Sequence, residues 1–368
     1  MPPPAAPLFF LSDLDGGGAQ RTTINLVRHW PEDRTRPVLA VARAAGPGRP
    51  WLDGIHPVDL GAGRLRRAFL PLRRLIRRRR PELVYSTMVG ANIVAATSVI
   101  GLRRPPLLVA RETNSHRARG DLSRAQRGAA GWAYRRAAAV VALSEGVRGE
   151  LVEDCRLEPE RVVTIHNPVD VDDFQKRARG SARPWPGEGP MVVAAGRLVR
   201  QKGFDILLRA FAQLRTKDAR LAILGEGSDR EALMRFADEL GVAERIVMPG
   251  HVADIAPWLA HAAAFALSSR WEGFGHVIVE AMACGAPVVA FDCPHGPADI
   301  IEDGRTGVLV PPLEGDALAA ALDRVLGDGE FAQRLRAAGR PAAMRFSAPA
   351  IARAYAGLFD DLCAAARH

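Results

Sequence analysis

The chain is poor in cysteine. It has four cysteines among 368 residues, and they form no CxxC pair and no spacing that suits a metal site. A disulfide framework and a cysteine-based zinc site are therefore excluded. We expect free thiols in a reducing compartment. The four residues are Cys155, Cys284, Cys293 and Cys363.

Long apolar runs are also missing. No stretch approaches the roughly 18 to 20 apolar residues needed to cross a bilayer. Residues 1–17, MPPPAAPLFFLSDLDGG, have no basic region before their short apolar run and pass straight into a glycine loop. That pattern predicts a first strand and not a signal peptide. We expect a cytoplasmic protein that is soluble or peripheral to a membrane.

Lysine is scarce, because the chain has 47 arginines and three lysines. The positive charge is uneven: residues 1–170 hold 27 basic and 16 acidic side chains, net +11, whereas the remainder holds 23 and 25, net −2. Nine of the arginines lie from Arg64 to Arg80, among apolar residues at helical spacing. Pro71 is expected to kink or divide this helix.

Two interpretations of this basic segment are open. It can be a crossover helix whose apolar stripe packs on a sheet while its arginines are solvated. It can also be a surface for an anionic membrane, whose lipids attract each nearby basic residue by about 1 kcal/mol. A coding bias toward arginine would produce the same excess. Nucleic acid is a weaker partner, because the segment lacks interleaved aromatic residues and the second half of the chain is acidic.

Apolar runs of strand length alternate with helical patterns along the chain. Such runs begin at residues 8, 83, 107, 138 and 162 in the first half and at 191, 221, 246, 264 and 288 in the second. This rhythm is typical of parallel sheets with helices on both faces. The Pro- and Gly-rich stretch 180–190 places a domain junction near residues 168–188. The length of the chain also favours two domains.

Residues 271–290, WEGFGHVIVEAMACGAPVVA, combine two carboxylates with a glycine-bounded aromatic residue. Gly273, Phe274 and Gly275 predict a tight loop at the start of a helix, whose N-terminal amides suit a phosphate. In one continuous helix Glu272 and Glu280 would be rotated by about 80° from each other, so both can meet one ligand only if Glu272 lies in the loop before the helix. The alternative is that both are solvated surface charges.

This segment resembles the Glu, seven residues, Glu signature of the retaining glycosyltransferases of family 4, and three further blocks follow that family's order. Gly196-Arg197-Leu198 with Gln201-Lys202-Gly203 looks like the family's phosphate-binding arginine and lysine. Leu224-Gly225-Glu226-Gly227 is similar to its second glycine turn, and Asp15-Gly16-Gly17-Gly18-Ala19-Gln20-Arg21 is similar to its N-terminal glycine loop. The joint match is specific and spans most of the chain.

The resemblance implies the GT-B fold. This is an α/β architecture of two Rossmann-like, doubly wound parallel-sheet domains that face a cleft, with a C-terminal helix crossing back to the first domain. We expect an acceptor-side domain over residues 1–170, a linker over 171–190, a nucleotide-sugar-binding domain over 191–346 and the returning helix over 347–368.

The resemblance also assigns roles in the donor site. Arg197 and Lys202 would neutralise the leaving diphosphate, and Glu272 would hold hydroxyls of the transferred sugar. Glu280 would accept hydrogen bonds from the ribose hydroxyls. The family implies no protein nucleophile, no metal and no cofactor besides the donor itself. The further donor-binding candidates are Gly17, Gly18, Gly225, Gly227, Val252, Gly273, Phe274 and Gly275.

One position departs from the family. Many relatives carry a sugar-contacting histidine after the fourth strand of the first domain, where this chain has Thr113. Either Glu112 or His116 replaces it, or the contact is absent. Asp13-Leu14-Asp15 resembles the metal-binding DxD of another glycosyltransferase fold, and we interpret it as a coincidence because a glycine loop follows it.

The expected activity is retaining transfer of a hexose or N-acetylhexosamine from a nucleotide sugar, UDP-linked, to a glycan or polyprenyl-linked acceptor. Residues 293–297, CPHGP, resemble a subset of the family that builds surface polysaccharides and lipopolysaccharides. With the basic first half, they indicate work at the inner face of the cell membrane. A sugar-nucleotide epimerase of the same architecture is one alternative, although it would need acid and base groups beyond Glu112, His116 and Glu272. A basic nucleic-acid-binding protein is the other.

Overall fold

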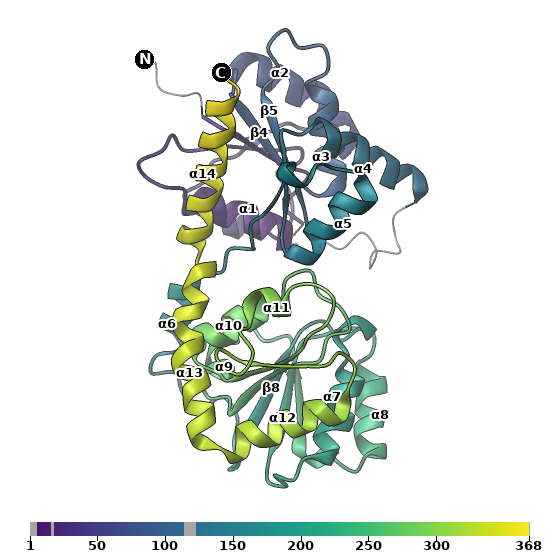
Figure 1. Ribbon diagram of the computed structural model, residues 1–368, viewed down its shortest axis with the longest axis vertical. Coiled ribbons are helices and arrows are strands. Elements are labelled where there is room, and N and C mark those ends of the chain that lie inside the picture. The colour runs from purple at the N-terminus through teal and green to yellow at the C-terminus, as the bar shows by residue number, and fades with distance from the viewer. Residues whose placement is uncertain (1–5, 16–17, 114–122, 368) are drawn as a thin grey trace. The chain divides into compact units, whose positions relative to one another are not determined.

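The computed structural model describes residues 6–15, 18–113 and 123–367. Contacts divide the chain into two units: unit 1 comprises Met1–Pro168 and Ala348–His368, and unit 2 comprises Val169–Ser347 (Figure 1). Each unit contains one sheet in which every pairing is parallel. The predicted α/β class with two Rossmann-like sheets is confirmed.

Unit 1 has a seven-stranded sheet in the order β3-β2-β1-β4-β5-β6-β7. The strands are β1 (Leu8–Leu11), β2 (Val38–Val41), β3 (Val58–Asp59), β4 (Leu83–Thr87), β5 (Leu107–Glu112), β6 (Ala139–Ala142) and β7 (Val162–Thr164). The helices are α1 (Gly18–Arg28), α2 (Phe69–Arg79), α3 (Val89–Ser98), α4 (Arg124–Arg136), α5 (Glu145–Cys155) and α14 (Ala348–Ala365). Apolar side chains from α2 to α5 fill one face of the sheet, and those from α1 and α14 fill the other.

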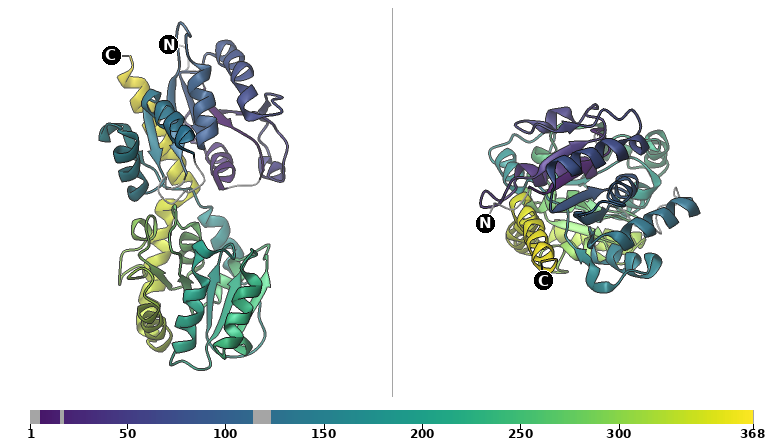
Figure 2. Two further views of the ribbon diagram at one scale, coloured as in Figure 1. Left: turned by 90° about the vertical axis from the view of Figure 1, so that its right-hand side faces the viewer. Right: turned by 90° about the horizontal axis from the view of Figure 1, so that it is seen from above.

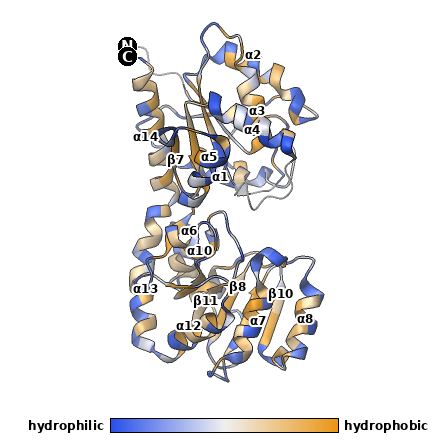
Figure 3. Cartoon of the chain, turned by 45° about the vertical axis from the view of Figure 1, so that its right-hand side comes forward, coloured by the Kyte–Doolittle hydropathy of each residue, from blue (hydrophilic) through white to orange (hydrophobic). Residues whose placement is uncertain are grey.

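Unit 2 has a six-stranded sheet in the order β10-β9-β8-β11-β12-β13. The strands are β8 (Met191–Ala195), β9 (Arg220–Leu224), β10 (Ile246–Gly250), β11 (Ala264–Leu267), β12 (Val288–Phe291) and β13 (Val308–Val310). The helices are α6 (Val171–Ala178), α7 (Phe204–Gln213), α8 (Arg230–Glu239), α9 (Ala256–Ala260), α10 (His276–Cys284), α11 (Pro297–Ile300), α12 (Gly315–Gly327) and α13 (Gly329–Ala343). Figure 3 shows the strands of this sheet as an apolar centre, which agrees with their burial.

Strand order reverses direction once in each sheet. The reversal lies between β1 and β4 in unit 1 and between β8 and β11 in unit 2. The loops that leave neighbouring strands at such a point diverge to opposite faces of the sheet and open a crevice at its carboxyl edge. Each unit therefore has one carboxyl edge where a ligand site is expected.

Helix α14 returns the C-terminal end of the chain to unit 1, as predicted (Figures 1 and 2, yellow). Its buried side chains include Tyr355 and Phe359, and these pack on Tyr85 and Phe9 of the sheet. Such aromatic pairs add to the apolar area that the helix buries.

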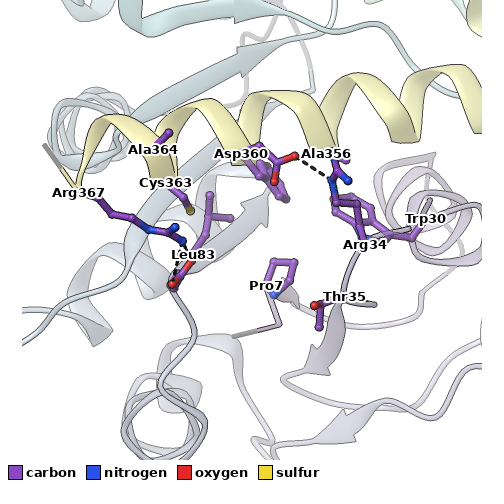
Figure 4. A pocket seen from close by; sticks show the side chains of 12 residues that line it. Pro7, Trp30, Arg34, Thr35, Leu83, Ala356, Asp360, Cys363, Ala364 and Arg367 are labelled. Carbon is purple, nitrogen blue, oxygen red and sulfur yellow. Dashed lines mark hydrogen bonds and ion pairs between the residues drawn. The ribbon is translucent and has the colours of Figure 1, made fainter. Parts of the chain in front are cut away.

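Ion pairs fix α14 at the amino edge of the same sheet. Arg34 donates to Asp360 at 2.8 Å, and Arg367 donates to Glu82 at 3.0 Å (Figure 4). The two pairs border a cavity of about 260 Å³ whose lining includes Trp30 and Cys363. This cavity lies where β1 and β4 begin, which is the edge opposite to the crevice.

Two local expectations differ from the structure. The predicted linker over 171–190 contains α6, and this helix packs against α9 and α10 within unit 2 because Val171 and Phe174 are apolar and become buried. The division falls instead between Pro168 and Val169. The basic segment is divided at Ala68 into a 3₁₀ turn and α2, so Pro71 lies in the first turn of α2, where its missing N–H costs no helical hydrogen bond.

Candidate donor site in unit 2

The crevice of unit 2 is formed by the loops after β8 and β11. The first contains Arg197 and Lys202, and the second contains Glu272. These three residues were predicted as the groups nearest the chemistry. Because β8 and β11 are neighbours at the reversal of strand order, the fold brings the two loops together at the carboxyl edge of the sheet.

Lys202 and Glu272 form an ion pair in this crevice. The Nζ of Lys202 lies 2.5 Å from Oε1 of Glu272, and both side chains are largely buried, with 17% and 8% of their surface exposed. The hydroxyl of Ser269 donates to the same Oε1 at 2.6 Å. Both contacts use Oε1 and hold the carboxylate in place. Oε2 is the oxygen that remains for a hydrogen bond from a ligand.

Glu272 precedes the helix, as the two-carboxylate interpretation requires. Helix α10 begins at His276, which puts Glu272 in the loop, and its backbone N–H donates to the carbonyl of Pro294 at 3.1 Å. Glu280 lies within α10 and is half-buried. Burial, reinforced by the charge of Glu280, raises the pKa of the Cys284 thiol to about 12. That thiol is therefore neutral and is no candidate nucleophile.

Arg197 differs from Lys202 in being exposed. Among the described residues its side chain has no ion pair or hydrogen bond. An unpaired guanidinium beside a buried ammonium gives this loop two donors of different geometry: a planar fork and a point charge. Together they suit a dianionic group.

The two glycines of the second turn are required by close backbone contacts. A Cβ at Gly225 would overlap the carbonyl oxygen of Gly196, and a Cβ at Gly227 would overlap that of Leu198. Gly225 also has φ of +141°. The N–H of Gly196 donates to Leu224 at 2.9 Å, so the loops after β8 and β9 are packed backbone to backbone.

The aromatic ring in the loop before α10 is buried. The ring of Phe274 is buried and packs on His276 and Phe346, with ring centroids 5.5 and 5.4 Å apart. Gly275 has φ of +94° and is the N-cap residue of α10, where no side chain caps the helix. The half-buried Gly273 completes the loop. Of Gly273, Phe274 and Gly275, only Gly273 has part of its surface exposed, because the other two are buried.

Val252 lies outside any strand. The predicted strand end at Met248 is two residues short, because β10 continues to Gly250 after a register shift that begins at Val247. Val252 is half-buried in the following loop. Its placement near the carboxyl edge of β9 and β10 follows from the sheet order.

The unit 1 candidates are placed differently. Glu112 is fully buried, and its two carboxylate oxygens accept hydrogen bonds from the N–H of Thr113, at 2.8 Å, and from the hydroxyl of Tyr134. A carboxylate engaged in this way is not suited to the sugar contact that the sequence suggested, and the half-buried Thr113 is the better placed of the two. Burial and the Glu112 charge raise the pKa of Tyr134 well above 10. Gly18 begins α1, whereas Gly17 and His116 lie outside the described residues.

The aspartates of the DxD tripeptide have partners from the protein. Asp13 accepts a hydrogen bond from Gln20 at 2.8 Å, and Asp15 forms an ion pair with Arg43 at 3.3 Å. Within the described parts of the chain, no group of three or more His, Cys, Asp and Glu residues is arranged to hold a metal ion.

Several residues around the crevice were not identified from the sequence. Ser269 fixes Glu272, and Gln201 and Arg270 join the two loops. The thiol of Cys293 lies close enough to Glu272 that burial and that carboxylate raise its pKa to about 12. Gln201 and Cys293 belong to motifs quoted from the sequence, but no local pattern predicts these contacts, because each residue acts across a tertiary contact.

Two family models match the chain over adjacent regions. The one described as Glycosyltransferase Family 4 matches residues 16–173, and the one described as Glycosyl transferases group 1 matches residues 176–341. Both describe glycosyltransferases, so neither the epimerase nor the nucleic-acid-binding alternative is favoured.

Individual proteins agree with the family models. An alpha-D-kanosaminyltransferase of Streptomyces kanamyceticus is 32% identical over 241 residues, 62% of this chain and 62% of that protein. A GDP-mannose-dependent alpha-(1-6)-phosphatidylinositol monomannoside mannosyltransferase of Mycolicibacterium smegmatis is 38% identical over 187 residues, 47% and 49% of the two chains. The match thus spans between about half and 62% of these relatives. The crystal structure of Anabaena HepE in complex with UDP has the same fold, with a TM-score of 0.82 over 97% of this chain and 100% of that one at 24% identity.

Proposed function

Since the chain belongs to family 4 of the GT-B glycosyltransferases, we propose that it transfers a sugar from a nucleoside diphosphate sugar to an acceptor hydroxyl with retention of anomeric configuration. The observation that carries this proposal is the Lys202–Glu272 pair at the reversal of strand order in unit 2. This pair supports the proposal because a cation, which suits a diphosphate, lies next to a carboxylate, which suits a sugar hydroxyl.

The chemistry follows from the charges. The bond between the sugar C1 and the diphosphate oxygen breaks, and the leaving diphosphate gains negative charge that Arg197 and Lys202 neutralise. The acceptor oxygen bonds to C1 on the face that the diphosphate leaves, and the acceptor's proton passes to the departing phosphate oxygen. Glu272 holds a sugar hydroxyl through Oε2, because Oε1 is engaged by Lys202 and Ser269. Glu272 is thus a positioning group and no covalent intermediate is needed.

The remaining donor contacts are backbone or ribose contacts. The amides of Phe274 and Gly275 bind phosphate or sugar, Glu280 binds the ribose hydroxyls and the backbone at Val252 meets the base. Because glycine has no side chain, the donor can approach the backbone closely at glycines 17, 18, 225, 227 and 273. Thr113 takes the place of the family's sugar-contacting histidine. With two cations in the crevice, the diphosphate needs no metal.

The donor is proposed to be UDP-linked and to carry a hexose or an N-acetylhexosamine. UDP is the nucleotide named with HepE, whereas the mycobacterial relative is named for GDP-mannose, so both bases belong in the test. That same relative is named for a lipid-linked acceptor. We propose a glycan or lipid-linked acceptor of surface polysaccharide biosynthesis for this chain as well.

The acceptor proposal includes a membrane surface on unit 1. The apolar stripe of α2 is mostly buried on the sheet, as the simpler interpretation of this segment requires, but Phe69 and Leu70 are 40% and 47% exposed. Ile100 is 47% exposed, and Arg73 donates to its carbonyl at 2.5 Å, which places it beside α2. Three exposed apolar side chains therefore lie in or next to the segment from Arg64 to Arg80, whose arginines other than Arg73 are exposed. This combination suits the inner, anionic face of a cell membrane.

The proposed contact with the membrane is peripheral and uses side chains at the surface of unit 1. Within the described residues, no helix is both long enough and apolar enough to cross a bilayer. Binding would then depend on the charges of the arginines and on the shallow insertion of Phe69, Leu70 and Ile100. We expect cosedimentation with anionic vesicles that weakens as salt rises, and that is lost when Phe69 and Leu70 are both changed to serine. Met234→Ser is the control, because Met234 is an equally exposed apolar residue of unit 2. Equal binding to neutral vesicles, or equal loss in the control, would contradict the surface.

The first test of the function is thermal stabilisation by a panel of nucleoside diphosphates and their sugars, with a Glu280→Ala variant beside the wild type. A shift with one nucleotide that weakens in the variant supports the donor site and identifies the base. Binding at 100 times Kd would stabilise the protein by about 2.7 kcal/mol, which is easily measured. No shift with any member of the panel would contradict the proposed function.

A further inference from the structure

Lys202 ends a short 3₁₀ turn and Glu272 lies in a loop, yet their contact is short. The two residues are 70 positions apart in the sequence, and neither belongs to the α-helix or strand beside it. A contact between two loops keeps its geometry only if other bonds join the same loops. Such bonds connect residues 200–203 to residues 268–272.

Four hydrogen bonds join these segments next to the ion pair. The N–H of Arg270 donates to the carbonyl of Gln201 at 2.8 Å, and the side chain of Gln201 donates to the carbonyl of Trp271 at 3.0 Å. The hydroxyl of Ser268 donates to the carbonyl of Lys202 at 3.0 Å. The guanidinium of Arg270 donates to the carbonyl of Arg200 at 2.8 Å. The bonds thus involve Lys202 and the two residues before it, and three of the four residues immediately before Glu272.

The backbones also touch between the loops. Gly203 has φ of +62°, and a Cβ there would overlap the carbonyl oxygen of Ser268. This approach leaves little room for the segments to slide past each other. The position of Lys202 relative to Glu272 is then set by how the two backbones are held together.

Arg270 also connects the loops to a rigid helix. Its guanidinium donates to both carboxylate oxygens of Asp205, at 2.8 and 2.7 Å, in a two-pronged ion pair. Asp205 lies in the first turn of α7, and α7 is anchored in the core of unit 2 by Phe204, Leu207 and Leu208. The planar fork of arginine suits this double contact, which lysine cannot reproduce.

We propose that Arg270, held by Asp205, is a positioning residue for the transfer reaction: it fixes the loops after β8 and β11 so that Lys202 meets Glu272 and both face the donor. This inference rests on the proposed roles of Lys202 and Glu272. It adds two residues to the site that touch neither donor nor acceptor and act through the ion pair. Their loss should lower turnover more than donor affinity.

The competing explanation is that the Asp205–Arg270 pair only stabilises unit 2. The two explanations differ at Lys202, because only positioning predicts a change at that amine while the rest of the unit is unaffected. The chain is well suited to this measurement, since it has only two other lysines, Lys176 and Lys217, and both are exposed and belong to unit 2.

The experiment measures the acetylation rate of each lysine by brief treatment of the folded protein with acetic anhydride, followed by mass spectrometry. The variants are Arg270→Lys and Asp205→Asn. Arg336→Lys is the matched control, because Arg336 also donates to two backbone carbonyls in unit 2, those of Gly285 and Ala262. We expect the rate at Lys202 to rise about fivefold in the two variants, as for a loosened, partly buried ion pair, with no change at Lys176 or Lys217 and no change in the control.

Kinetics complete the test. For the donor identified by the nucleotide panel, kcat should fall about tenfold in Arg270→Lys while KM changes much less, because misalignment affects the transition state more than binding. An unchanged Lys202 rate in both variants would overturn the proposal. So would a parallel rise at all three lysines, since that would indicate general loosening. If the wild type bound no nucleoside diphosphate, the proposed function would fail, and the Lys202 rates would still decide whether Arg270 holds this residue.

Discussion

The two sheets have the same pattern of strand order, but charged residues at their carboxyl edges differ in burial and in their partners. In unit 1 the charged residues at the end of β5 are buried: Arg111 is 1% exposed and donates to Thr87 and Asn167, and Glu112 is fully buried. In unit 2, Arg197 is exposed, and Lys202 and Glu272 form an ion pair with 17% and 8% of their side chains exposed. The buried charges of β5 stabilise the fold of unit 1, whereas those of the unit 2 loops are the ones that we propose for the donor.

Single glycine positions also differ. A Cβ at Gly18, where α1 begins, would meet nothing within 4 Å, although one at Gly46 in the loop after β2 would overlap the carbonyl oxygen of Leu14. In unit 2, Gly203, Gly225 and Gly227 each lie against a backbone carbonyl of a neighbouring loop. The crevice of unit 2 is therefore organised within its own unit before any ligand arrives, and preorganised charges are those that contribute most to stabilising a transition state. Four groups of substitutions test this contrast.

The largest effect is expected from the ion pair of unit 2. Lys202→Met removes a cation from the leaving diphosphate and should lower kcat by about 10²- to 10³-fold. Glu272→Gln keeps the shape but weakens the grip on the sugar, and we expect a similar loss with smaller change in nucleotide affinity. Steady-state kinetics and calorimetry measure the two quantities. Retention of near-normal turnover in both variants would remove these residues from the mechanism.

The next effect compares the glycines. Gly225→Ala puts a Cβ against the carbonyl of Gly196 at φ of +141° and should destabilise unit 2 by about 2 kcal/mol or more. Gly18→Ala enters open space at the start of a helix and should change stability by less than about 1 kcal/mol. Urea unfolding of both variants gives the comparison. Equal destabilisation would show that the packing contrast between the loops is unimportant.

A smaller effect is expected inside unit 1. Tyr134→Phe removes a hydrogen bond from the buried Glu112 carboxylate and should cost about 1–3 kcal/mol of folding stability. Nucleotide affinity should not change, because this pair belongs to the fold of unit 1. Denaturant unfolding beside nucleotide calorimetry tests both statements, and a selective loss of nucleotide binding would contradict the division of roles.

The smallest effect concerns Asp205, whose pair with Arg270 is partly exposed. Hydrogen bonding to Arg270 lowers the pKa of Asp205. Its stabilising contribution is therefore present above the ordinary carboxyl pKa of about 3.9 and is lost as pH falls through the lower folded value. Asp205→Asn should be less stable than the wild type at neutral pH by at most about 1 kcal/mol, and the difference should vanish in acid. A difference that grows on acidification would contradict this assignment.

Much of the fold was predictable because its signals are local. Apolar runs marked the central strands, and three predicted runs, at 8–11, 264–267 and 288–291, coincide with β1, β11 and β12. Strands β2, β3 and β13 were not among the predicted runs. The two or three residues of β3 and β13 give little pattern, although β7, which also has three residues, was predicted. Helix α6 was predicted as linker for a related reason: two apolar residues in eight carry little helical signal, and packing on α9 and α10 decides its position.

The sequence by itself determined the α/β rhythm, the position of Glu272 in a loop before its helix and the glycine turns, because periodicity and turn chemistry depend on neighbouring residues. Only the tertiary structure decided which charges meet. Glu112 and Glu272 are both carboxylates that end or follow a strand, yet one is buried against Tyr134 and the other pairs with Lys202. The contacts of Lys202 with Glu272 and of Asp205 with Arg270 join residues 70 and 65 positions apart. Strand order and loop contacts, which no local pattern encodes, bring them together.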